Sequence, residues 1–137
     1  MATGAALDDV GKLVLRLSVG ILMLLHGFAK ISGGVQGIVG LVAAAGLPGA
    51  AGYLVYVGEV LAPVLVVIGL WTRPAALLMV ITMIVAVWLA HMNDLFTLTR
   101  TGGWALELQG LFLFGSLAIA LLGAGRYSAG GERGRWN

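Results

Sequence analysis

Four ionisable side chains lie inside long apolar stretches of this sequence, where a charge is costly. Arg16 and His26 belong to the first stretch, Glu59 to the second and Glu107 to the last. A charged side chain at the centre of a lipid bilayer costs at least about 2.5 to 3.5 kcal/mol, so such residues normally face the inside of a helix bundle and pair. Two carboxylates, an imidazole and a guanidinium could together bind a polar group or exchange a proton.

The depths of these residues can be compared if each stretch is a membrane-spanning helix. Counted from the face where the first stretch ends, His26, Glu107 and Glu59 lie roughly 6, 7 and 10 Å deep, and Arg16 roughly 21 Å. We therefore predict that Glu59, Glu107 and His26 share a layer as the reactive groups. Arg16 is expected to pair with Glu59 from below.

Three further residues, together with Arg16 at the inner end of the pocket, are predicted to bind a ligand beside this layer. Lys30 follows the first stretch and would lie above the carboxylates, while Tyr56 lies one helical turn from Glu59 and could donate its hydroxyl. Trp104 precedes Glu107 by three residues and could form the floor of a pocket. Pro63 lacks the N–H that would bond the carbonyl of Glu59, which leaves that oxygen free.

Other uses of the same residues remain open. A purely structural charge network would look the same from the sequence. Two glutamates and a histidine also suit a metal ion, but the Glu-x-x-His spacing of di-iron bundles is absent, so no metal site is predicted. A haem held by His26 and His91 is disfavoured, because His91 stands at the very end of its stretch, where an interfacial histidine is commoner.

The composition requires a membrane environment. Sixty per cent of the 137 residues are apolar and only ten per cent are charged, whereas a soluble domain carries about a quarter charged residues. The mean hydropathy is +1.02. The basic residues form no run with aromatic residues, so nucleic-acid binding is not expected, and the absence of cysteine removes thiol chemistry.

The elements that must position the ionisable residues are helices. The chain is predicted to be an all-α, multi-pass membrane protein, a single domain over residues 1–137 that forms a four-helix transmembrane bundle. Each span is close to the roughly 20 residues that cross a bilayer, and the spans cover approximately residues 11–29, 52–70, 74–92 and 103–123. A signal peptide at the first stretch is disfavoured, because no small-residue cleavage motif follows it.

Two segments lie outside the predicted spans. Residues 31–49 are rich in glycine, but their apolar residues recur at helical spacing, so a short interfacial or re-entrant helix is expected there. Residues 124–137 are expected to be a tail. Lysine and arginine are more frequent beside the termini than at the opposite ends of the spans, which predicts that both termini are cytoplasmic.

Several short motifs, in this order, resemble the DoxX family of small bacterial four-helix membrane proteins. They run through most of the chain, and their order is more specific than any one of them. One departure is that Ala129 and Gly130 stand where the family often has an acidic residue. The matching segments are Leu15-Arg16-Leu17 with Gly20, His26-Gly27-Phe28-Ala29-Lys30, Gly46-Leu47-Pro48, Glu59, Gly69-Leu70-Trp71-Thr72-Arg73-Pro74-Ala75-Ala76, Glu107 and Gly123-Ala124-Gly125-Arg126-Tyr127-Ser128.

The resemblance implies a location in the bacterial inner membrane and a link to respiratory or sulfur redox chemistry, since DoxD relatives form a subunit of a thiosulfate to quinone oxidoreductase. Arg16, His26, Lys30, Glu59 and Glu107 map onto family positions. No intrinsic cofactor is expected, so redox work would need a bound quinone and a membrane or peripheral redox partner, in addition to the lipid bilayer. Homo-oligomers are also compatible with so small a core.

The leading functional hypothesis is therefore a quinone-linked oxidoreductase subunit that is not active alone, in which the ionisable cluster binds the quinone head group or handles protons. The alternative is a non-catalytic accessory or assembly subunit, whose charges only hold its helices in register. A proton-coupled transporter is less favoured, because the four helices show no repeat of the kind that transporters use.

Overall fold

The computed structural model describes residues 2–137, and regular structure in this range is helical. The chain begins with α1 (Ala2–Gly33), which extends beyond the predicted span at both ends. The predicted short helix in the following glycine-rich segment is α2 (Gln36–Ala44). Gly34 and Gly46, on either side of α2, have positive φ angles of 83° and 82°, which glycine adopts without strain.

The second apolar stretch forms one composite helix of three parts. It begins as the 3₁₀-helix η1 (Gly49–Leu54), continues through the π-helix η2 (Val57–Leu61) and ends as α3 (Ala62–Ile68). The missing N–H of Pro63 prevents a regular ladder here, and the N–H of Ala62 instead bonds the carbonyl of Val57, five residues earlier. Short π segments inside helices are frequent at functional sites.

The second half of the chain contains a helical hairpin. It consists of α4 (Thr72–Ala90), the short 3₁₀-helix η3 (Met92–Asp94) and α5 (Glu107–Leu122). Within the described residues, α1, the composite helix and α4 are long and apolar enough to cross a membrane, while α5 is apolar but shorter. The predicted all-α, multi-pass membrane fold is confirmed.

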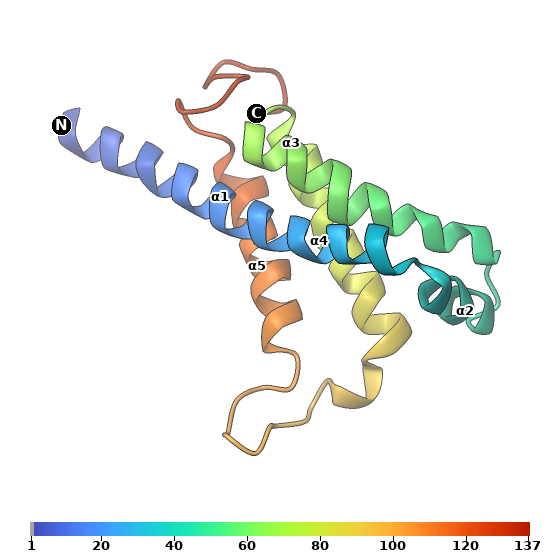
Figure 1. The fold of residues 1–137 in the computed structure, drawn as a ribbon. Coiled ribbons are helices and arrows are strands. Elements are labelled where there is room, and N and C mark those ends of the chain that lie inside the picture. Colours follow the sequence, from blue (N-terminus) through green and yellow to red (C-terminus); the bar gives the residue numbers. More distant parts are fainter. Residues whose placement is uncertain (1) are drawn as a thin grey trace.

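Two helix pairs cross one another in this bundle. Figure 1 shows α1 running beside the composite helix, with α4 and α5 together behind them at a steep angle. The core lies where the pairs meet, and small residues on α3 and α4 allow the helices to approach closely. Its fully buried members include Met23, Ala62, Val66, Ala76, Met79 and Ile119.

The residues after α5 fold back over the bundle instead of forming a free tail. The N–H groups of Ala129 and Gly130 bond the carbonyls of Ile68 and Gly69, at the end of α3. The side-chain oxygen of Asn137 accepts from the hydroxyl of Thr72, at the start of α4, over 2.8 Å. In Figure 1 this segment lies at the same end of the bundle as the N-terminus, opposite the α4–α5 connection.

Candidate functional site

The most deeply placed charge pair in the bundle joins α1 to the π segment. Lys30, in the last turn of α1, donates a hydrogen bond from Nζ to Oε2 of Glu59 in η2. Glu59 is only 4% exposed, and the Lys30 side chain is 27% exposed. A buried carboxylate needs such a partner, because an isolated charge in a low-dielectric interior is very costly.

The backbone around Glu59 is shaped to bring three helices together. A Cβ on Gly27 of α1 would overlap the Glu59 carbonyl, and a Cβ on Gly58 would overlap the side chain of Thr82 on α4. The carbonyl that the sequence predicted to be free therefore lies against α1. Tyr56 donates its hydroxyl to the carbonyl of Lys30 over 3.1 Å, which holds the end of α1 in place.

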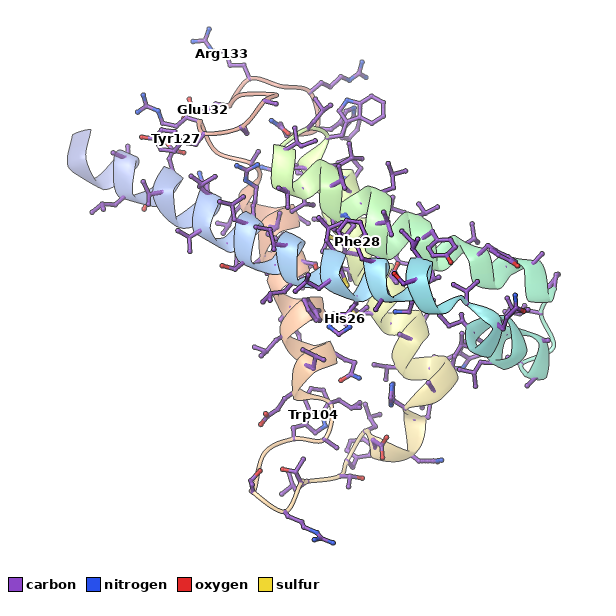
Figure 2. The ribbon with its side chains drawn as sticks, in the orientation of Figure 1. His26, Phe28, Trp104, Tyr127, Glu132 and Arg133 are labelled. Atoms are coloured by element: carbon purple, nitrogen blue, oxygen red, sulfur yellow. The ribbon has the colours of Figure 1, made fainter. Side chains whose placement is uncertain are left out.

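A small polar cavity of about 150 Å³ opens beside this pair. Its polar lining comes from α1, η2, the end of α4 and the start of α5, and comprises His26, Lys30, Glu59, His91 and Gln109. His26 is exposed and packs its ring edge-on against Phe112, with ring centroids 5.4 Å apart. Figure 2 shows His26 projecting from α1 on the side of α5. A cavity of this size can hold a few water molecules or a small polar head group.

A larger and mostly apolar cavity, of about 450 Å³, lies on the other side of the pair. The two cavities share four lining residues: Lys30, Glu59, Ala86 and His91. The remaining walls come from α2, the composite helix and α4, and include Ile38, Leu41, Val42, Leu47, Val55 and Val85. The polar groups thus stand at one end of an apolar space, as in many sites for amphipathic ligands.

Arg16 does not belong to this site, and its predicted pairing with Glu59 is wrong. The guanidinium is 1% exposed and donates to two backbone carbonyls, that of Val66 over 3.1 Å and that of Tyr127 over 2.6 Å. It therefore ties α1 to α3 and to the C-terminal segment. Lys30 takes the expected place of Arg16 because it lies near Glu59, in the last turn of α1, whereas Arg16 lies about midway along α1, where the C-terminal segment contacts it.

Glu107 is also absent from the layer that the sequence predicted. It is exposed at the first turn of α5, where its carboxylate accepts a hydrogen bond from the backbone N–H of Trp104 over 3.1 Å. The predicted span of residues 103–123 placed it inside a helix, but α5 begins only at Glu107. A carboxylate in the first turn of a helix is favoured by the helix dipole, which explains its position without a catalytic role.

Trp104 lies in the α4–α5 connection and not beneath Glu59. Its indole N–H donates to the carbonyl of Leu95 over 2.8 Å. It does line a pocket, but this is a separate apolar cavity of about 400 Å³ between α4 and α5. Figure 2 shows Trp104 beyond the end of α5, well away from His26.

His91 and Gln109 are the polar members of the site that sequence reasoning missed. The His91 Nδ1 atom lies 3.6 Å from a carboxylate oxygen of Asp94, and its Nε2 atom lies 3.5 Å from the Gln109 side-chain nitrogen. Both ends of the ring thus face polar groups while the ring lines both cavities. The signal in the sequence was that His91 ends the third span at the same face as Lys30 and His26.

No cluster of three or more candidate metal ligands occurs among residues 2–137. The polar residues at the shared wall of the two cavities are an ammonium, a carboxylate and an imidazole, and the amide of Gln109 lines the polar cavity. The arrangement suits hydrogen bonding and proton exchange with an uncharged polar group.

A known protein family matches the part of the chain that contains Lys30 and Glu59. The DoxX family model matches residues 11–92, which include His26, Lys30, Glu59 and His91. The chain belongs to the DoxX family.

A curated relative of this DoxX chain is "Putative oxidoreductase CatD" from Bacillus subtilis (strain 168). The two are 32% identical over 116 residues, which cover 85% of this chain and 81% of the relative. No solved structure matches the chain. Glu107 and Gln109 lie outside the part matched by the family model.

Proposed function

We propose that this DoxX protein is the quinone-binding membrane subunit of a redox complex in the bacterial inner membrane. In this proposal the quinone head group lies at Lys30, Glu59 and His91, and its isoprenoid tail lies in the 450 Å³ apolar cavity. The observation that carries the proposal is the wall shared by a polar and an apolar cavity. An amphipathic ligand of that kind needs both environments next to each other.

Each polar residue has a distinct role in this proposal. Lys30 can turn its ammonium from Glu59 toward a quinone carbonyl, since an ammonium has three donors. Glu59 keeps Lys30 in place and exchanges protons with the head group through waters of the 150 Å³ cavity. His26 and His91 also line that cavity. In this proposal they pass protons between the cavity and the end of the bundle where His91 lies beside Asp94.

In this proposal the chain carries no electron carrier of its own, and the electrons come from a partner. Reduction of a quinone to a quinol consumes two electrons and two protons. In this proposal the electrons come from a reduced cofactor of a partner protein, and the protons pass through the polar cavity. The printed name of the Bacillus subtilis relative, "Putative oxidoreductase CatD", supports a redox role in this proposal.

Equilibrium binding of decylubiquinone and of a short-chain menaquinone to the purified full chain in lipid nanodiscs would test the proposal. We expect saturable binding that Glu59→Gln and Lys30→Met each weaken at least about tenfold, or about 1.4 kcal/mol. Glu107→Gln is the matched control, because it makes the same chemical change at an exposed carboxylate outside both cavities. Equal affinity of Glu59→Gln and wild type would refute the assignment.

The non-catalytic accessory role remains the second candidate, and one observation favours it. The Lys30–Glu59 pair also joins two helices, so its loss could lower the amount of folded protein without touching any ligand. That role predicts that Glu59→Gln reduces the abundance of the protein in the membrane. It also predicts that neither folded wild type nor folded Glu59→Gln binds quinone saturably.

A further inference from the structure

The α4–α5 connection is built as a small hairpin held together by backbone hydrogen bonds. Leu98 and Trp104 form an antiparallel bridge. The N–H of Thr99 bonds the carbonyl of Gly103 over 2.7 Å, and the N–H of Ala105 bonds the carbonyl of Thr97 over 2.9 Å. The N–H of Trp104 is bonded to the carboxylate of Glu107 as well.

The hairpin presents an apolar surface made by Phe96 and Leu98, which alternate in the sequence with the polar Thr97, Thr99 and Thr101. The hydroxyls of Thr99 and Thr101 lie 3.0 Å apart within its turn. Phe96 is 95% exposed and Leu98 is 69% exposed. Large apolar side chains so fully exposed on an ordered element mark a contact surface.

The length of α5 indicates what covers that surface. Its 16 residues rise about 24 Å, less than the roughly 30 Å of a bilayer core. The hydrocarbon region must therefore extend past one end of α5, or the bilayer must become thinner around it. The hairpin leads directly into the first turn of α5, with buried Leu106 just before it.

The surroundings of the hairpin continue the lipid-facing surface of the spans. The 400 Å³ cavity behind it has an apolar lining in which Ile84, Trp88, Met92 and Phe114 are all more than half exposed, so the cavity opens onto the outer face of α4 and α5. Trp88 and Trp104 both line it. Tryptophan rings prefer the level of the lipid head groups, which places this cavity and the hairpin at the membrane surface.

We propose that the hairpin of residues 95–106 is inserted into the boundary between lipid head groups and acyl chains, with Phe96 and Leu98 in contact with lipid. Arg100, at the turn, can extend its guanidinium to the phosphates, and the threonine hydroxyls are in contact with water. The hairpin thus completes the membrane-embedded length of α5 and anchors the end of the bundle that holds His91 and Gln109. This inference does not depend on quinone binding.

The chain contains no cysteine, so single nitroxide labels can be placed without removing native thiols. The variants Phe96→Cys, Leu98→Cys, Thr99→Cys and Thr101→Cys would be labelled in full-length protein in phospholipid nanodiscs. Power-saturation EPR would then compare collision with oxygen, which concentrates in lipid, and with a water-soluble nickel chelate. We expect a several-fold higher oxygen-to-nickel ratio at positions 96 and 98 than at the two threonine positions.

The four oxygen-to-nickel ratios decide whether the hairpin is inserted into lipid. Equal, water-like ratios at all four positions would overturn the proposal and leave a protein partner as the occupant of the apolar face. Because positions 96 and 98 are measured in separate variants, loss of one variant to misfolding leaves the other to test the same face.

Discussion

Lys30 and Glu59 lie 29 residues apart in the sequence, and their side chains meet as an ion pair between the last turn of α1 and the π segment of the second span. The pair stands at the wall shared by a polar and an apolar cavity. It is therefore both a link between helices and the most suitable polar anchor for a ligand in the bundle.

Removal of one partner of this pair should destabilise the protein more than removal of both. Lys30→Met leaves Glu59 buried without its cation, and breaking a buried pair in this way costs roughly 3 kcal/mol. The double variant Lys30→Met with Glu59→Gln should recover much of that loss, since no unpaired charge is left. Thermal unfolding in mild detergent would measure this, and a double variant as unstable as the sum of the singles would contradict it.

A larger side chain at Ala86 should block the proposed ligand without touching a charge. Ala86 lines both cavities, and a phenylalanine there would occupy the space next to Lys30 and Glu59. We expect quinone affinity to fall by about tenfold, or about 1.4 kcal/mol, as measured by the nanodisc titration. Leu77→Phe is the control, because Leu77 lies on α4 but is 48% exposed and lines neither cavity. Unchanged affinity of Ala86→Phe would place the ligand elsewhere.

Close approach at Gly27 should be essential for the packing of α1 against the π segment. A side chain there would overlap the carbonyl of Glu59, so Gly27→Val should lower stability by about 1–3 kcal/mol through overpacking. Gly40→Ala in α2 is the matched control, because nothing lies within 4 Å of its added Cβ. It should be neutral or stabilising by about 0.5–1 kcal/mol, since alanine favours a helix interior. Chemical denaturation of the two variants side by side would test the contrast.

Arg16 should hold the C-terminal segment against the bundle. Its guanidinium bonds the carbonyls of Val66 and Tyr127, and each buried carbonyl left without a donor costs roughly 1–3 kcal/mol. In Arg16→Met, hydrogen exchange of residues 123–137 should become much faster, while the end of α1 near Lys30 stays protected. Arg100→Met, at the opposite end of the protein, should leave that exchange unchanged. Full protection of the segment in Arg16→Met would show that its other contacts are sufficient.

Glu107 and Lys30 show why the depth of a residue in the membrane is hard to predict from the sequence. The predicted depth depends on where each helix ends, and two of the helix ends lie elsewhere in the structure. α1 continues to Gly33, four residues beyond the predicted end, and α5 begins at Glu107, four residues after the predicted start. These shifts moved Glu107 out of the bundle and brought Lys30 into it.

The sequence by itself determined the class of the fold, the short helix α2 and the presence of ionisable groups inside the spans. These follow from composition, from apolar stretches of membrane length and from helical spacing, which are local properties of the chain. It also identified Glu59, Lys30 and His26, which line one cavity, and the resemblance that pointed to the DoxX family.

Only the tertiary structure decided which of the charges pair. The crossing of the two helix pairs brings Lys30, Glu59 and His91 to one wall, and the C-terminal segment returns to take the bonds of Arg16. Partner choice depends on the rotation of each helix about its axis and on the angle between helices. Both are set by close approach at Gly27 and Gly58 and by the π segment at Glu59, because a few ångströms of displacement are enough to replace one buried partner by another.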